Sequence, residues 1–451
     1  MHLFRKSGLI AALCCLVLVA VGSPAGAAVF NPQSFTLANG MQVVVVTNRR
    51  APVVAHMVWY RVGAADEPAG QSGIAHFLEH LMFKGTDTVS PGEFSRIVAR
   101  NGGTDNAFTS QDYTAYFQKV ARDRLELVMR IEADRMRNLT LTDAEVLPER
   151  DVVLEERRSR TDNDPGSQLY EAARATLFLN HPYGIPIIGW KHEIENLSTD
   201  DALAFYRRYY APNNAILIVA GDVSLAELRP LAEKYYGVLK PGPAIVRKRI
   251  REPPHLAPRR VEMTSPRVGQ PSWSRTYLAP SYRGSVGNEA YALQVLARLL
   301  GGGATSRLYR ALVVEQGIAA SAGAWYSPDH LDYGTFGLSV SPRPGKKLAA
   351  ASDALLAAIA HLLKDGVTDK EVASAKKRMS ASAIYARDSL SAAPNIIGRA
   401  LTTGRRIEDV ESWPERIRAV TRAEVEAAAR KVLVEAASVT SVLRPAPRAK
   451  E

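Results

Sequence analysis

The sequence has 451 residues, and its 57 Lys and Arg residues outnumber its 46 Asp and Glu residues to give a formal net charge of +11. This length has room for two domains of ordinary size. The basic residues are scattered and not interleaved with aromatic residues, and no phosphate-binding loop is present. We therefore expect a solvated basic surface and no nucleic-acid partner.

The first 27 residues have the features of a secretory signal peptide: a basic pair, an apolar run, and small residues before a cleavage site at Ala28. The apolar run is short for a membrane span, so we expect no transmembrane segment in the mature chain. Both cysteines, Cys14 and Cys15, lie in this leader. The mature chain is therefore expected to be exported, with the periplasm as its destination, and to have no disulfide or thiol nucleophile.

Strand and helix signals alternate along the first half of the chain. Asn39-Gly40 separates two strand-like runs and predicts a hairpin. Ser72 as an N-cap and Gly85 as a C-cap would delimit a short buried helix. Further strands are expected in Val53–Val62, Thr104–Val120 and Asn214–Gly221, and further helices in Arg122–Leu139, Thr142–Arg160 and Ser224–Tyr236.

The second half repeats the order of signals in the first. Thr142-Asp-Ala-Glu-Val146 returns as Thr368-Asp-Lys-Glu-Val372, 226 residues later, and a helix-then-strand run returns at an offset of 222 residues. A segment rich in Pro and Arg lies between the copies. We therefore predict an α+β fold of two homologous α/β domains. The boundaries are a signal peptide at 1–27, an N-terminal domain at 28–240, a linker at 241–262 and a C-terminal domain at 263–446.

The short helix carries a motif for metal catalysis. His76 and His80 are four residues apart and share one helix face, where two imidazoles can converge on one ion. With a carboxylate and an open position they form the ligand set of a catalytic zinc, and Glu79 would act as general base. The order His-x-x-Glu-His is the inverted zinc-peptidase motif. On these five residues alone, two histidines that share a face by chance are an equally good interpretation.

The helix after Thr142 offers candidates for the third ligand. Glu149 and Glu156 are seven residues apart and share a face, whereas Glu155 points away from it. On composition alone, this helix is typical of an exposed, salt-bridged surface helix. At the 226-residue offset these two glutamates become Ala375 and Ser382, so only the first domain is expected to hold a metal.

Four segments closely resemble the pitrilysin/insulinase family of zinc peptidases: 73–86, Asn101–Tyr116, Glu149–Glu156 and His181-Pro-Tyr-Gly184. The likeness is greatest to mitochondrial processing peptidase beta-type subunits and to bacterial two-chain relatives. It implies that one Zn²⁺ is bound by His76, His80 and Glu156, because Glu156 follows His80 by 76 residues, the spacing of the family's glutamate ligand. It also implies that Glu149 supports the site and that the chain forms half of a clam-shell chamber.

In this family the substrate adds as a β-strand along a sheet edge near the zinc. The matching stretch is Gly103–Thr109, and the residues expected to hold the peptide are Asn106, Ala107 and Phe108. The alternative interpretation of this stretch is an ordinary strand opening.

One departure from the family pattern concerns the partner. Members that work alone carry an Arg and a Tyr that help to hold the scissile carbonyl, and here Val313 and Ala320 stand in those positions. Neither side chain can donate a hydrogen bond to a developing oxyanion. The resemblance therefore implies a heterodimer with a homologous chain that lacks the zinc motif but carries the Arg/Tyr pair, with a homodimer as the second choice.

The sequence thus predicts an exported zinc metalloendopeptidase subunit that hydrolyses unfolded peptides and is completed by a partner. The alternative is a catalytically silent peptide-binding or assembly subunit of the same fold. The intact metal motif favours the first interpretation, and the missing Arg/Tyr pair favours the second.

Overall fold

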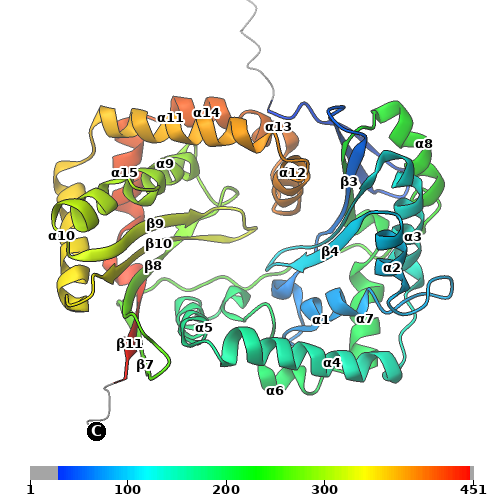
Figure 1. Ribbon diagram of the computed structural model, residues 1–451, viewed down its shortest axis with the longest axis horizontal. Coiled ribbons are helices and arrows are strands. Elements are labelled where there is room, and N and C mark those ends of the chain that lie inside the picture. Colours follow the sequence, from blue (N-terminus) through cyan, green and yellow to red (C-terminus); the bar gives the residue numbers. More distant parts are fainter. Residues whose placement is uncertain (1–28, 447–451) are drawn as a thin grey trace, which may run out of the picture.

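The computed structural model describes residues 29–446, so the predicted signal peptide and both cysteines lie outside the described residues. The chain has a mixed α/β fold with two sheets, each accompanied by helices, as predicted (Figure 1). None of the described helices combines the length and the apolar character that are needed to span a bilayer.

The first sheet has six strands in the order β1-β2-β6-β3-β5-β4. The predicted hairpin is present, because β1 and β2 pair antiparallel across a turn in which Gly40 has a φ of 90°. The run Thr104–Val120 forms two antiparallel strands, β4 and β5, which leaves β4 at the edge of the sheet. The strand bounds are β1 (Gln33–Thr36), β2 (Gln42–Thr47), β3 (Val53–Tyr60), β4 (Thr104–Thr109), β5 (Thr114–Ala121) and β6 (Ala215–Gly221).

The second sheet repeats the arrangement of the first. Its order, β7-β11-β8-β10-β9, matches β2-β6-β3-β5-β4 strand for strand. In each sheet only one pair is parallel, β2 with β6 and β7 with β11. This topology confirms the predicted duplication. The strand bounds are β7 (Arg259–Ser265), β8 (Ser272–Pro280), β9 (Ala319–Ser327), β10 (Tyr333–Pro342) and β11 (Ser438–Pro445).

Helices cover one face of each sheet and build its main core. In the first half this core contains buried residues of α1 (Ile74–Leu81), α3 (Leu125–Asn138), α7 (Thr199–Tyr209) and α8 (Leu225–Tyr235). In the second half it contains buried residues of α9 (Glu289–Gly301), α10 (Leu348–Asp365), α11 (Asp369–Ala386) and α15 (Arg422–Val432). Two apolar cores of this kind allow each half to exclude water from its own sheet.

The two halves also exchange one helix each. Helix α12 (Ala392–Thr402) belongs to the second half but packs on β3 and β6, on the face opposite α1. Helix α5 (Pro165–Leu177) belongs to the first half but packs on β7 and β11. Gly398 of α12 lies so close to the Trp59 ring that an added Cβ would be 2.1 Å from it. The exchange joins the halves through buried apolar contacts.

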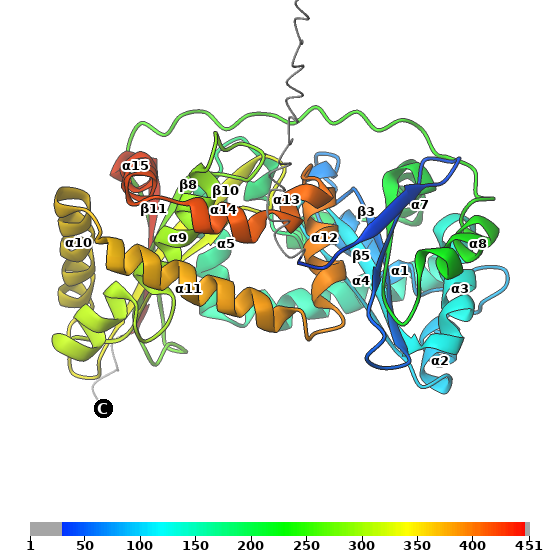
Figure 2. The ribbon, with the colours of Figure 1, turned by 90° about the horizontal axis from the view of Figure 1, so that it is seen from above.

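The connection between the halves, from Lys240 to Pro258, contains no helix or strand and crosses along one side of the molecule (Figure 2). Strand β7 begins at Arg259, inside the segment predicted as linker. Arg249 anchors this connection in a buried ionic network, with Nη2 2.9 Å from Asp66 Oδ1 and Nη1 3.3 Å from Asp332 Oδ2. It also pairs with Asp112, so one guanidinium binds carboxylates of both halves.

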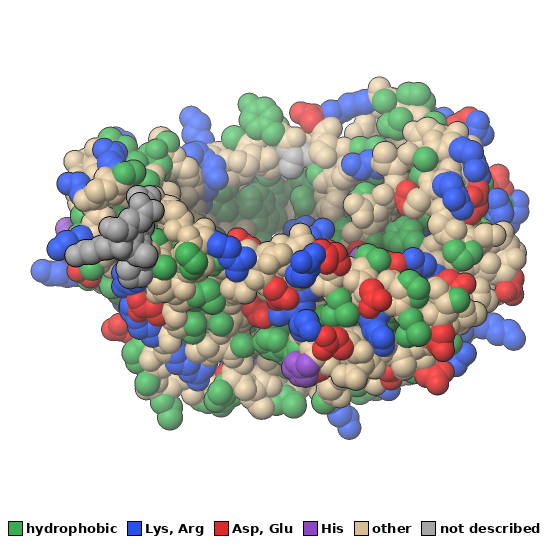
Figure 3. Space-filling view, turned by 60° about the horizontal axis from the view of Figure 1, so that its bottom comes forward, with side chains coloured by type: hydrophobic (Ala, Val, Ile, Leu, Met, Phe, Trp, Pro, Cys, Tyr) green, Lys and Arg blue, Asp and Glu red, His purple; other side chains and the backbone are tan. Residues whose placement is uncertain are grey.

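The two halves enclose a hollow with hydrophobic side chains on its floor (Figure 3). Helices α1 and α4 (Asp143–Arg157) and strand β4 lie close together in the first half, since α1 contacts both of the others. This arrangement positions the candidate site.

Candidate metal centre

Helix α1 carries the histidine motif, but its ends differ from the prediction. The N-cap is Gly73 in a left-handed conformation with a φ of 89°, and the C-cap is Met82. Ser72 instead uses Oγ to accept a hydrogen bond from the Trp190 backbone N–H, at 2.8 Å. A Cβ on Gly73 would lie 2.5 Å from the Ile188 carbonyl oxygen, so this close approach requires glycine. The assignments of Ser72 as N-cap and Gly85 as C-cap were therefore wrong.

The structure brings His76, His80 and Glu156 together. One ligand atom from each lies within 4.8 Å of the others, which is the spacing that a single metal ion requires. Glu156 Oε2 is 3.6 Å from His76 Nε2 and 3.3 Å from His80 Nε2. The two histidines come from consecutive turns of α1, and the glutamate comes from the last turn of α4.

The donor set fits a cation. Glu156 Oε2 and His76 Nδ1 are buried and have no hydrogen-bond partner. A buried carboxylate oxygen without a donor is costly, and a cation between these groups would satisfy it. Two imidazoles and one carboxylate are also the ligand types that Zn²⁺ takes in catalytic sites.

Glu149 lies behind His80, where it can hold the ring in position. His80 Nδ1 is 2.9 Å from Glu149 Oε1, so this nitrogen donates to the carboxylate and Nε2 faces Glu156. Lys84 pairs with the other oxygen of Glu149. Outer-shell carboxylates of this kind fix the tautomer and orientation of a ligating histidine.

Electrostatics distinguish the two histidines. Burial, followed by the charge of His80, lowers the pKa of His76 to about 4. Burial also opposes protonation of His80, but the hydrogen bond with Glu149 and the negative charge of the nearby Glu156 outweigh it and raise the pKa of His80 to about 9. The cluster therefore favours one positive charge next to the Glu156 carboxylate, and binding a divalent cation would displace a proton from His80.

Glu79 is held next to this cluster by a contact that the sequence did not reveal. Its Oε2 accepts a hydrogen bond of 2.6 Å from Thr109 Oγ1, on the last residue of the edge strand β4. Burial raises the pKa of Glu79, and the hydrogen bond from Thr109 partly offsets that rise. A carboxylate whose pKa is shifted toward neutrality is suited to accept and return a proton.

Two further contacts of the site were missed in the sequence. Arg160 pairs with Glu156 and Lys84 pairs with Glu149, so each carboxylate has a cationic neighbour. Arg160 is four residues after Glu156, and this spacing is the signal that could have identified it. Glu155 is exposed and pairs with Arg158 at 2.6 Å, as expected for a residue outside the cluster.

The predicted peptide-binding residues lie on β4 but do not share one role. Asn106 lines an open pocket of about 450 Å³ beside Glu79 and His80. Ala107 packs on the main core of the first half. The Phe108 ring instead packs edge-on against Trp59, with a centroid distance of 5.3 Å, on the opposite face of the sheet. Phe108 therefore has a packing role that the sequence prediction did not include.

In the second half, the positions that the duplication relates to the glutamates, Ala375 and Ser382, both lie on α11. The two positions where the family has its Arg and Tyr are Val313 and Ala320. Val313 lies within the short helix Tyr309–Glu315, and Ala320 lies in the edge strand β9. Tyr326, also on β9, donates a hydrogen bond from its hydroxyl to the Pro280 carbonyl oxygen at 2.5 Å, so this hydroxyl is bonded within the second half.

Comparisons with known proteins agree with this architecture. A model of the insulinase family (peptidase family M16) matches residues 42–191, and a model of the peptidase M16 inactive domain matches residues 196–379. The zinc protease PqqE of Helicobacter pylori is 36% identical over 365 residues, which cover 80% of this chain and 81% of that protein. The uncharacterized zinc protease YmxG of Bacillus subtilis is 30% identical over 358 residues, 79% of this chain and 84% of that protein.

Solved structures show the same fold. A protease from Helicobacter pylori matches with a TM-score of 0.86 and 32% identity, over 92% of this chain and 99% of that chain. The first half of the periplasmic protease PqqL from Escherichia coli matches with a TM-score of 0.79 over 92% of each chain, at 20% identity. The chain therefore belongs to the insulinase family of peptidases, family M16, and the resemblance stated from the sequence is confirmed.

Proposed function

We propose that this chain is an exported zinc metalloendopeptidase subunit that hydrolyses unfolded peptides. The observation that carries the proposal is the convergence of His76, His80 and the unpartnered Oε2 of Glu156 beside a buried Glu79. Relatives named zinc proteases, at up to 36% identity among those compared, support the same conclusion.

In this proposal, His76, His80 and Glu156 hold one Zn²⁺. When bound, the ion supplies a Lewis acid that lowers the pKa of a water molecule and polarises the scissile carbonyl. Glu79 accepts the proton of the attacking water at its carboxylate and returns it to the leaving amine. Thr109 holds that carboxylate in place, and Glu149 keeps His80 in the tautomer whose Nε2 is free to ligate.

The peptide would bind along the edge strand β4, which pairs with β5 on one side only among the described strands. Backbone N–H and C=O groups on the other edge can then pair with an extended peptide, regardless of its sequence. Asn106 lies beside Glu79 in the adjoining pocket, where it can contact the residues that flank the scissile bond.

A partner is part of the proposal because the chain lacks the Arg/Tyr pair of the family at Val313 and Ala320. A homologous chain that carries this pair would close the hollow from the opposite side. The full PqqL protein has a similar fold over 47% of its chain, so about half of that larger protein lies beyond the match. Export to the periplasm is proposed from the leader sequence, and the structurally similar PqqL is a periplasmic protease.

The second candidate function is a catalytically silent peptide-binding or assembly subunit. The absence of donors at Val313 and Ala320 favours it. A decisive experiment follows hydrolysis of quenched fluorescent peptides by the zinc-loaded mature chain, alone and mixed with a homologous chain that carries the Arg/Tyr pair, with and without a chelator. Chelator-sensitive cleavage that rises at least tenfold in the mixture is expected. No cleavage in either case, with zinc bound, would favour the silent subunit.

A further inference from the structure

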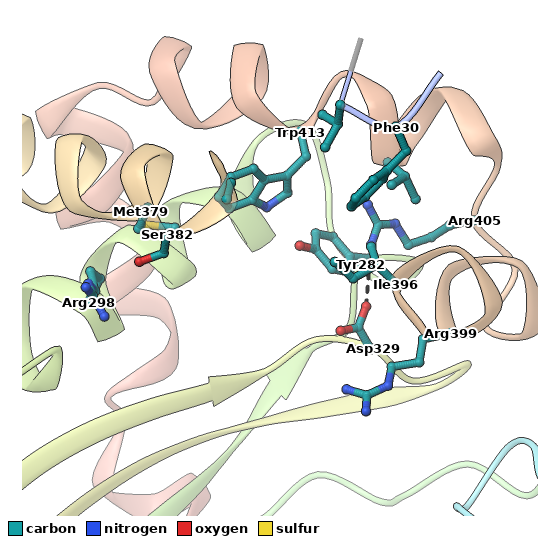
Figure 4. Close-up of a pocket in the computed structure, with 13 residues that line it drawn as sticks. Phe30, Tyr282, Arg298, Asp329, Met379, Ser382, Ile396, Arg399, Arg405 and Trp413 are labelled. Atoms are coloured by element: carbon teal, nitrogen blue, oxygen red, sulfur yellow. Dashed lines mark hydrogen bonds and ion pairs between the residues drawn. The ribbon is translucent and has the colours of Figure 1, made fainter. Parts of the chain in front are cut away.

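The second half contains a pocket of about 390 Å³ between helices α9, α11 and α12 and the first described residues of the chain (Figure 4). This volume is within the range of small-ligand sites. Its walls are largely apolar and aromatic, and the main contributors are Phe30, Tyr282, Met379, Ile396 and Trp413. The pocket does not include any residue of the candidate metal centre.

Three arginines reach this pocket, and only one of them has an acidic partner there. Arg405 Nη1 is 3.4 Å from Asp329 Oδ1, and its guanidinium stacks on the Tyr282 ring at 3.7 Å from the centroid. Arg298 and Arg399 make no ion pair with any described residue. Arg298 Nε is moreover buried without a hydrogen-bond partner. The pocket therefore has an excess of positive charge that the described chain does not neutralise.

A second arginine increases the charge near Arg298. Arg378 lies one residue before Met379 on α11, and its Nε is also buried and without a partner. Burial, followed by the charge of Arg298, lowers the pKa of Arg378. Two neighbouring guanidinium groups with unsatisfied buried nitrogens are costly unless an anion binds between or beside them.

The duplication explains why the pocket lies here. Helices α9 and α11 are the counterparts of α1 and α4, the pair that brings together the histidines and Glu156. At the position related to Glu156, the second half has Ser382, and Arg298 supplies a cation from α9. Helices α9 and α11 therefore present a cationic and apolar surface that suits an anion with an apolar substituent. Helices α1 and α4 present histidines and a carboxylate, which suit a cation.

We propose that this pocket binds a ligand in which a carboxylate is joined to an apolar or aromatic group. The carboxylate would pair with Arg298, whose planar guanidinium group matches its geometry and which lies beside Met379 and Ser382. The apolar group would lie against Met379 and extend toward Trp413. The C-terminal residue of a peptide and a free small carboxylic acid share this chemistry. The proposal does not depend on hydrolysis at the metal centre.

The test is calorimetric titration of the full mature chain, zinc-loaded and carrying Glu79→Gln so that peptides are not consumed. The probes are acetyl-Gly-Ser-Gly-Phe with a free C-terminus, the same peptide amidated, and 3-phenylpropanoate. We expect the free-acid peptide to bind at least roughly tenfold more tightly than its amide, because a hydrogen-bonded ion pair is lost in the amide. Equal affinity of acid and amide would overturn the proposal.

Variants assign binding to this pocket. Arg298→Gln should weaken the free acid at least roughly tenfold. The matched control Arg310→Gln, on an exposed arginine of the same half that pairs with Glu315, should leave binding unchanged. If Arg298→Gln does not fold, Arg298→Lys, which keeps the charge but loses the paired donors, replaces it and should also weaken the free acid. Unchanged affinity in the folded arginine variant would refute the proposal. If 3-phenylpropanoate binds in a way that depends on Arg298 and the peptide does not bind, the proposal holds and the ligand is a free carboxylic acid, not a peptide C-terminus.

Discussion

Replacing Glu156 by Gln tests the ligand set most selectively. The Glu156 carboxylate lies 3.3 Å from His80 Nε2 and 3.6 Å from His76 Nε2, and its Oε2 has no other partner. Gln keeps the shape but removes the charge of this ligand atom. Loss of an outer-shell partner typically costs 10–100-fold in metal affinity, so loss of a charged ligand should cost more than roughly 100-fold.

The same helix supplies a matched control, Glu155→Gln, and a variant with an intermediate expected effect, Glu149→Gln. Glu155→Gln removes an exposed carboxylate that pairs only with Arg158 and should leave zinc affinity unchanged. Glu149→Gln removes the acceptor for His80 Nδ1 and should cost about 10–100-fold. Competition with a chromogenic zinc chelator measures all three affinities, and circular dichroism checks folding. Wild-type affinity in Glu156→Gln, or a loss confined to Glu155→Gln, would refute the assigned ligand set.

Three further predictions concern positioning and stability. Thr109→Val removes the hydrogen bond to Glu79 and should slow peptide hydrolysis roughly tenfold with zinc content unchanged, whereas loss of zinc would show that Thr109 is structural. Gly398→Ala should lower the free energy of unfolding by about 1–3 kcal/mol, because its Cβ would meet the buried Trp59 ring, while Gly269→Ala has open space and should be neutral in the same urea titration. Burial opposes ionisation of Glu371, but hydrogen bonds from Arg307 and Thr368 outweigh it and lower its pKa to about 2. The contribution of Glu371 to the free energy of unfolding is therefore present above its unfolded pKa of about 4.3 and is lost as pH falls toward 2. The Glu371→Gln variant should lack this pH-dependent contribution. Identical curves of unfolding free energy against pH for the wild type and the variant would contradict the assignment.

Local patterns predicted helix α1 because its histidine motif spans only two consecutive turns. His76, Glu79 and His80 needed only helical spacing, and the structure places them as that spacing requires. The selection of Glu156 needed the family resemblance, since composition described α4 as a surface helix. The structure brings this residue to the histidines through packing of α1 on α4, which the pattern of a single helix does not encode.

Contacts between distant segments account for what the sequence did not show. Thr109 reaches Glu79 from 30 residues away, and Arg249 reaches Asp112 from 137 residues away. The exchange of α5 and α12 between the halves also depends on tertiary packing and not on local propensity. The cap at Ser72 was wrong for a similar reason, because a left-handed Gly73 packs against Ile188 and begins the helix there.

The central claim is that Glu79 is the general base of a zinc peptidase and not a metal ligand. It is tested most directly by measuring zinc content and the cleavage rate of quenched fluorescent peptides together, for the wild-type chain and Glu79→Gln. We expect one zinc per chain in both proteins, slow chelator-sensitive cleavage by the wild type, and no cleavage above background by the variant. Cleavage that persists in Glu79→Gln, or loss of zinc from it, would contradict the account.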